Sequence, residues 1–145
     1  MNYNIDKILI DTNILVYSAV TISEFCIPAR ALIGKYLMAD TQLFITWQII
    51  REFAVTMTSK ELKTIHETFE NIELFSQQMT ILPETNDTFS NWKELIIRYD
   101  VKGKNIHDGN IIAVMNSNKI NNILTHNIKD FQRYSKIINI IPLIA

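Results

Sequence analysis

Short runs of apolar residues alternate along this chain with longer segments in which apolar residues recur every three or four positions. The short runs, rich in β-branched residues, are typical of buried strands, and the wider spacing is typical of amphipathic helices. The pattern predicts strands at Ile8–Ile10, Leu43–Ile45, Ile81–Pro83, Ile123–Thr125 and Ile137–Ile141. It predicts helices at Asn13–Val20, Pro28–Ala39, Trp47–Met57, Leu62–Met79, Asn86–Tyr99 and from Asp108 onward, with a loop at Lys102–Lys104 and a polar connection at Thr125–Tyr134.

Alternation of strands and helices is typical of an α/β fold in which helices cover a central sheet. We therefore expect a doubly wound, mainly parallel five-stranded sheet within one domain spanning residues 1–145. The core should include the helix stripe at Ile65, Phe69, Ile72 and Phe75, together with Phe89 and the two tryptophans, Trp47 and Trp92.

Composition narrows the class of protein. The chain has 145 residues, of which 48% are hydrophobic, enough for one sizeable core. Cys26 is the only cysteine, which excludes an internal disulfide and suits a reducing compartment; we expect it to be a buried apolar residue. No secretory leader and no membrane span is expected, so the sequence favours a cytoplasmic protein.

Four acidic residues stand at positions that are typical of functional sites, at or near the ends of predicted strands and in predicted helices. Asp11 follows the first strand, Glu52 lies within a helix, Asp108 opens a helix, and Asp130 follows the fourth strand. Parallel strands deliver such residues to one edge of a sheet, where ligands bind. Clustered carboxylates repel one another unless a divalent cation is present, and oxygen ligands without cysteine or paired histidine favour Mg²⁺ or Mn²⁺.

Each acid taken alone also has a structural interpretation. Asp11 can cap the following helix, Glu52 can belong to a solvated helix face, and Asp108 can stabilise a helix N-terminus. Asp130 can be an ordinary turn residue. The net charge of −1 gives no basic signature. If a metal neutralises four acids, however, the remaining 11 acids face 14 lysines and arginines, which leaves a modestly basic surface of about +3.

Four stretches of the chain resemble the PIN-domain nucleases, and within them the VapC-like toxins of bacterial toxin–antitoxin pairs. The matching stretches are Ile8–Tyr17, Ile49–Phe53, Ile106–Ala113 and Ile123–Phe131. They occur in the family's order and spacing and run from near the start of the chain to near its end.

The resemblance implies a PIN-like three-layer α/β/α fold and Mg²⁺- or Mn²⁺-dependent cleavage of single-stranded RNA. The metal ligands it implies are Asp11, Glu52 and Asp108. The family's fourth acid stands two residues after the threonine of the last motif, where this chain has Asn127. Either Asn127 contributes its amide oxygen there, or Asp130 takes over; both are therefore candidate catalytic residues.

Several further residues are candidates for holding RNA. Thr12 and Thr125 are placed to hydrogen-bond an aspartate or a phosphate, and Asn13 is placed to fix the first turn of the helix; a purely structural role is the alternative for each of them. Basic residues near the predicted site suit phosphate contacts, and solvated surface charge is the alternative for each of them. These basic candidates are Arg51, Lys102, Lys104, Lys129 and Arg133. His107 and His126 stand beside presumed site residues and can touch substrate or serve as a general acid, with His66 a weaker candidate.

The leading hypothesis is an endoribonuclease toxin that forms a homodimer and is neutralised by a small antitoxin, as the resemblance implies. A solitary RNA-processing nuclease and a non-catalytic module that binds RNA or a partner through a degenerate site remain open. A phosphatase using Asp11 as nucleophile is a further alternative, although Asn13 stands where a second aspartate is expected.

Overall fold

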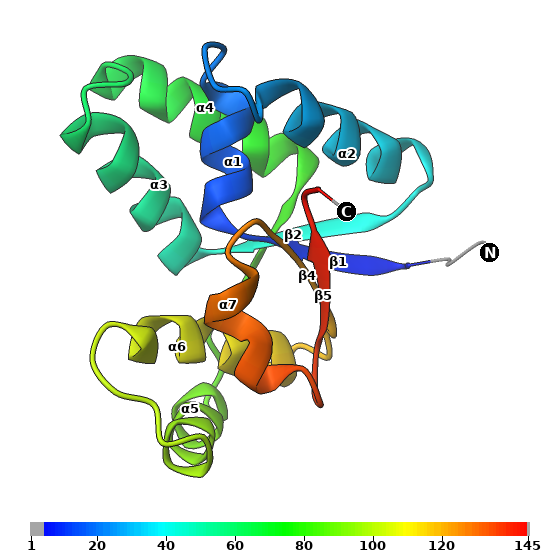
Figure 1. The fold of residues 1–145 in the computed structure, drawn as a ribbon, viewed down its shortest axis with the longest axis vertical. Helices are drawn as coiled ribbons and strands as arrows, with labels where there is room; N and C mark the ends of the chain where they lie inside the picture. Colours follow the sequence, from blue (N-terminus) through cyan, green and yellow to red (C-terminus); the bar gives the residue numbers. More distant parts are fainter. Residues whose placement is uncertain (1–4, 145) are drawn as a thin grey trace.

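Five short strands lie side by side in one parallel sheet, in the order β3-β2-β1-β4-β5 (Figure 1). The computed structural model describes residues 5–144; the expected domain of 1–145 includes residues 1–4 and 145, which lie outside this part. The strands are β1 (Lys7–Ile10), β2 (Gln42–Thr46), β3 (Thr80–Leu82), β4 (Asn122–Thr125) and β5 (Asn139–Pro142). The predicted five-stranded parallel sheet is confirmed.

Helices cover both faces of this sheet. One layer contains α1 to α4, and the other contains α5 (green), α6 (yellow) and α7 (orange), as Figure 1 shows. The helices are α1 (Thr12–Ala19), α2 (Cys26–Met38), α3 (Trp47–Ser59), α4 (Ile65–Gln78), α5 (Thr88–Arg98), α6 (Asn105–Ser117) and α7 (Ile128–Phe131), followed by the 3₁₀ turn η1 (Gln132–Tyr134). This arrangement is the three-layer α/β/α fold expected for a PIN-like chain.

The strands are buried because helices pack on both sides of them. Ile8, Leu9 and Ile10 of β1 are fully inaccessible, as are Ile123 and Leu124 of β4. A strand that is buried on both faces needs a continuous apolar run, which explains why these strands lack an alternating polar pattern. Cys26 is also buried and unpaired, as predicted.

The segment Thr125–Tyr134 differs from its prediction as a polar connection. It contains the short helix α7 and the turn η1, and it contributes Phe131 and Tyr134 to the core at 1% and 0% exposure. Charged and amide residues separate these two rings in sequence, which hid the helical spacing. Asp108 likewise does not open its helix, because α6 begins at Asn105 and places Asp108 in the first turn.

Several large apolar side chains expected in the core are exposed. Trp47, Ile65, Phe69 and Phe89 have exposed fractions of 53%, 69%, 54% and 67%. Trp47 and Ile65 are the first residues of α3 and α4, where each helix begins at the rim of its layer. α4 does bury Phe75, as predicted, and Ile72 packs against the core, so only the Ile65 and Phe69 part of the predicted stripe is exposed.

The chain order creates a switch point at the middle of the sheet. From β1 the next strands, β2 and β3, are added on one side, and β4 and β5 are later added on the other. Ligands bind to such sheets beyond the carboxyl ends of the strands at this point. Asp11 and Thr125 stand at these ends of β1 and β4, which are neighbouring strands. Within residues 5–144, the structure has no helix with the length and hydrophobicity needed to cross a membrane.

Candidate active site

Asp11 is held rigidly at the switch point. Its backbone N–H donates to the Leu124 carbonyl at 3.0 Å, which joins the end of β1 to β4. Its Oδ1 accepts the backbone N–H of Thr12 at 2.8 Å. Its Oδ2 accepts the hydroxyl of Thr125 at 2.8 Å and the amide Nδ2 of Asn13 at 3.0 Å. Asp11 therefore caps α1, as its structural interpretation proposed, while its carboxylate also lines a cavity.

Thr125 and Asn13 form the support beneath this carboxylate. The Thr125 hydroxyl accepts the backbone N–H of Asn127 at 3.0 Å, and the Asn13 Oδ1 accepts that of His126 at 2.9 Å. Thr125 has no exposed surface, so the structure places it under Asp11 rather than on the cavity wall. Together the two side chains fix the segment after β4 against the start of α1.

Glu52 enters the same region from α3. The Thr46 hydroxyl at the end of β2 caps this helix by accepting the backbone N–H of Ile49, so α3 starts at the carboxyl edge of the sheet. Glu52 Oε2 accepts the hydroxyl of Thr12 at 3.0 Å, and its Oε1 accepts the Nε2 of Gln48 at 2.9 Å. Glu52 is therefore a fixed part of the site and not a freely solvated helix acid.

Gln48 connects this helix to the helix that carries Asp108. Its Nε2 also donates to the His107 carbonyl at 2.8 Å, and its Oε1 accepts the Nδ2 of Asn110 at 3.1 Å. The side chain is 8% exposed. Sequence reasoning missed Gln48, although its position one helical turn before Glu52 put it on the same face of the helix.

The four acids meet around one cavity of about 300 Å³. Its walls come from α1, α3, α6 and the α7 region, and they include both candidates for the fourth acidic position. The lining residues are Asp11, Thr12, Asn13, Val16, Tyr17, Glu52, Thr56, Lys60, Asp108, Asn127 and Asp130. Asn127 and Asp130 therefore both border the cavity on which the other acids converge.

The cavity concentrates negative charge in a partly buried place. Burial raises the pKa of Asp11 to about 6, although the hydrogen bonds from Thr125 and Thr12 partly offset this effect by lowering the pKa. Burial also raises the pKa of Asp108 to about 7, with further contributions from the charges of Asp11, Asp130 and Glu52. Uncompensated carboxylates behave in this way when they share a site without a cation. Arg133 opposes the shift at Asp108, which places one guanidinium near the cavity.

The donor set fits a hard divalent cation. Carboxylate, amide and hydroxyl oxygens line the cavity, and repulsion among the carboxylates is what a bound cation relieves. Within residues 5–144, no three histidine, cysteine, aspartate or glutamate side chains stand close enough together to hold a metal ion by themselves. Proteins usually bind Mg²⁺ through one or two carboxylates plus water and substrate phosphates.

Three of the basic candidates lie outside the lining of the acidic cavity, and one basic residue of that lining was not predicted. Arg51, Lys102 and Lys104 do not line the acidic cavity; Lys102 instead lies 3.5 Å from the Asp100 carboxylate in an exposed ion pair. Lys60 lines the cavity and was not predicted. Its spacing gave a signal, because Lys60 follows α3 directly and continues the four-residue spacing of Glu52 and Thr56 on one face of that helix.

The three histidines also differ in their surroundings. His66 lies on α4, where its Nε2 is 3.0 Å from the Glu70 carboxylate on the exposed surface. His107 is exposed and contributes its carbonyl to Gln48. His126 borders a second hollow beside the acidic cavity, together with Lys129.

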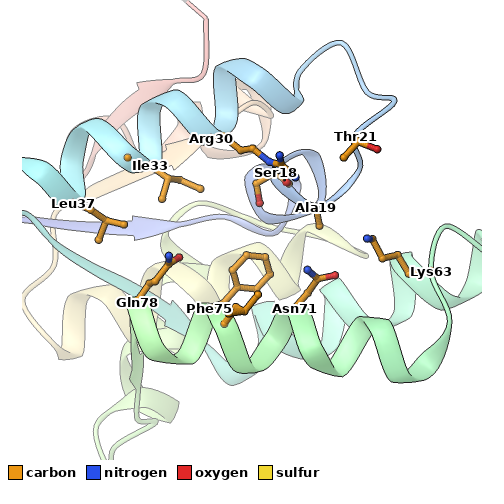
Figure 2. Close-up of a pocket in the computed structure, with 12 residues that line it drawn as sticks. Ser18, Ala19, Thr21, Arg30, Ile33, Leu37, Lys63, Asn71, Phe75 and Gln78 are labelled. Carbon is orange, nitrogen blue, oxygen red and sulfur yellow. Dashed lines mark hydrogen bonds between the residues drawn. The ribbon is translucent and has the colours of Figure 1, made fainter.

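A separate cavity of about 340 Å³ lies between α1, α2 and α4 (Figure 2). Arg30 and Lys63 reach it from opposite sides, and its other walls are apolar or amide side chains such as Ile33, Phe75 and Asn71. The lining contains no carboxylate, so this cavity lacks the ligands that a divalent cation prefers. The acidic cavity is therefore the candidate active site.

Comparison with known proteins agrees with the fold. Residues 8–137 match the PIN domain family. The chain belongs to the PIN domain family. A search by sequence among curated proteins finds no significant match.

Several solved structures share the fold. A chain of VapBC2 from Rickettsia felis, solved with a DNA fragment from their promoter, superposes with a TM-score of 0.71 at 17% identity, covering 94% of this chain and 98% of that one. A chain of VapBC-1 from nontypeable Haemophilus influenzae gives 0.72 at 16% identity, covering 96% and 99%. VapC20 of Mycobacterium tuberculosis, a sarcin-ricin loop cleaving toxin, gives 0.63 at 14% identity, covering 80% and 86%. At these identities the likeness shows the fold.

Proposed function

We propose that this protein is a Mg²⁺- or Mn²⁺-dependent endoribonuclease that cleaves single-stranded RNA. One observation carries the proposal: four carboxylates border a single cavity at the switch point of a PIN-domain sheet, where burial and the charges of the other three raise the pKa of Asp108. A fold that uses these acids only for capping and solubility has no reason to bring them together. Membership of the PIN domain family and the likeness to an RNA-cleaving toxin support the same function.

Asp11 and Asp108 would hold the metal, with Glu52 binding it directly or through a water and with Asn127 or Asp130 completing the wall of the site. A divalent cation bound there lowers the pKa of a coordinated water and stabilises charge on the phosphodiester oxygens. The chain's own residues supply orientation. Thr125 and Asn13 hold Asp11 from below.

Two further contacts serve the same site. Thr12 and Gln48 hold the two oxygens of Glu52, which leaves this carboxylate in a fixed position on the wall. Lys60, the residue directly after α3, places a cation at the cavity for the RNA backbone.

The geometry argues against an aspartyl-phosphate mechanism. Asp11 is 5% exposed, and both of its oxygens already accept hydrogen bonds. This mechanism also expects a second aspartate two residues on, where this chain has Asn13, whose amide donates to Asp11.

The structural neighbours support a biological setting. Two of them are chains of VapBC complexes, and a further one is a toxin–antitoxin complex from Klebsiella pneumoniae. We therefore propose that the protein is a cytoplasmic toxin, acts as a homodimer and is neutralised by a small antitoxin. Expression of the chain alone should arrest growth of its host, and co-expression of the small protein encoded beside it should relieve the arrest; growth unaffected by the chain alone would favour a solitary processing nuclease.

Cleavage itself is tested with purified protein and a single-stranded RNA labelled at its 5′ end. We expect internal cuts with Mg²⁺ or Mn²⁺, none in EDTA, and products with 3′-hydroxyl ends. RNA that is bound but left intact at every metal concentration would instead identify a non-catalytic binding module.

A further inference from the structure

Three aromatic side chains from distant parts of the sequence meet beside the acidic cavity. Tyr17 on α1, Phe25 just before α2 and His126 just after β4 form what we call the aromatic trio. The ring centroids are 4.6 Å apart for Phe25 and His126, 4.9 Å for Tyr17 and Phe25, and 5.6 Å for Tyr17 and His126. Each ring is half-buried, so the trio is neither part of the closed core nor free in solvent.

The trio is placed at the boundary of two hollows. Tyr17 lines the acidic cavity, and His126 lines a neighbouring hollow of about 460 Å³. Asn127 and Asp130 border both. A ligand strand that passes from one hollow to the other therefore crosses the segment after β4, with His126 at its side.

His126 is anchored to the machinery of the site. Its backbone N–H donates to the Asn13 Oδ1 at 2.9 Å, and the Asn13 amide also donates to Asp11. The imidazole makes no side-chain hydrogen bond among the described residues, and the rings of Phe25 and Tyr17 support it. A planar side chain that is backed by other rings and has no polar partner is suited to stacking.

We propose that the aromatic trio, with His126 in contact with the ligand, seats an unpaired base of single-stranded RNA next to the scissile phosphate. This rests on the proposed function. Aromatic and histidine side chains are the usual platforms for splayed bases of single-stranded RNA, and stacking is worth about 1–3 kcal/mol per base. Lys129 lines the same hollow and provides a cation for the adjoining phosphate.

The test measures RNA affinity and cleavage separately. Binding of a short single-stranded RNA in EDTA, where no cleavage is expected, is compared for the wild-type protein, His126→Ala and His126→Phe. We expect His126→Ala to weaken binding about 5- to 150-fold, the range that 1–3 kcal/mol represents, and His126→Phe to bind within about twofold of wild type. Phe89→Ala, which removes an exposed ring on α5, is the matched control and should leave binding unchanged.

Kinetics distinguish stacking from proton transfer. With Mg²⁺, His126→Ala should raise KM and leave kcat within about twofold, and His126→Phe should restore KM. Phe25→Leu, which removes a supporting ring while keeping an apolar side chain, should raise KM as well. Equal affinity of His126→Ala and wild type, or loss of kcat in both His126 variants, would overturn the inference. If the wild-type protein cuts no RNA, the proposed function fails while the binding comparison still decides the stacking site.

Discussion

The buried carboxylate of Asp11 makes the metal-free protein more stable in mild acid than at neutral pH. The pKa of this group is raised from 3.8 to about 6 in the folded chain, chiefly by burial. The folded state therefore binds the proton more tightly than the unfolded state does. Stability falls as the pH rises from about 4 to about 6 and levels off above that window.

The size of the effect follows from the shift. A difference of about two pKa units corresponds to about 3 kcal/mol over the whole window, and to about 1.4 kcal/mol between pH 7.5 and pH 5.0. Asp108 adds a contribution of the same sign, because its pKa is raised to about 7, but its partial exposure weakens that contribution. Glu67, whose pKa is lowered by hydrogen bonds from Thr64, acts in the opposite direction.

Urea unfolding in EDTA at pH 5.0 and pH 7.5, followed by circular dichroism, measures this dependence. Asp11→Asn removes the titrating group and also a charge that raises the pKa of Asp108, so the difference between pH values should shrink by at least about 1.4 kcal/mol relative to wild type. Glu67 is present in both proteins and cancels. The exposed Asp87→Asn variant is the control and should match wild type. Wild-type and Asp11→Asn curves with the same pH dependence would refute the reasoning.

Four other substitutions test the site, its support and the packing of the helices. Gly109→Ala places a Cβ 2.6 Å from a side-chain atom of a neighbouring helix. The overpacking costs about 1–3 kcal/mol and should cancel or exceed the gain of about 1 kcal/mol that alanine brings to a helix in place of glycine. Gly34→Ala meets nothing within 4 Å, so it should show that gain in urea unfolding. Thr125→Val removes the buried hydroxyl that donates to Asp11 and should cost about 1–3 kcal/mol of unfolding free energy, and an unchanged midpoint would contradict the network. Lys60→Ala should reduce the slope of log affinity for RNA against log salt by about 0.7, and a wild-type slope would remove Lys60 from the phosphate contacts.

Much of the fold could be predicted because its signals are local. The run at Ile8–Ile10 is purely apolar, and the run at Ile123–Thr125 is apolar except for its last residue. Such continuous apolar runs are typical of strands that are buried on both faces, as these two strands are. The short helix α7 was missed because four residues give too little periodicity to recognise. Trp47 was misassigned because hydrophobic spacing does not show where a helix leaves the core.

The placement of the candidate site residues could be predicted where it follows from the end of a strand or the face of a helix. Asp11, Glu52 and Asp108 border one cavity because the strand order places their elements at the same edge of the sheet. The contribution of Gln48 could not be predicted, because its partners His107 and Asn110 are about 60 residues away in sequence and only tertiary packing brings them together.

The central claim is that RNA is cleaved in the acidic cavity. The most direct test is to measure the rate at which wild type, Asp108→Asn and Asp87→Asn cut one labelled RNA in Mg²⁺. Asp108 borders the cavity, whereas Asp87 is an exposed carboxyl at the start of α5. We predict cleavage by wild type and Asp87→Asn at similar rates, and a loss of at least about 100-fold in Asp108→Asn, equivalent to about 2.7 kcal/mol of transition-state stabilisation. Cleavage by Asp108→Asn at the wild-type rate would contradict the account.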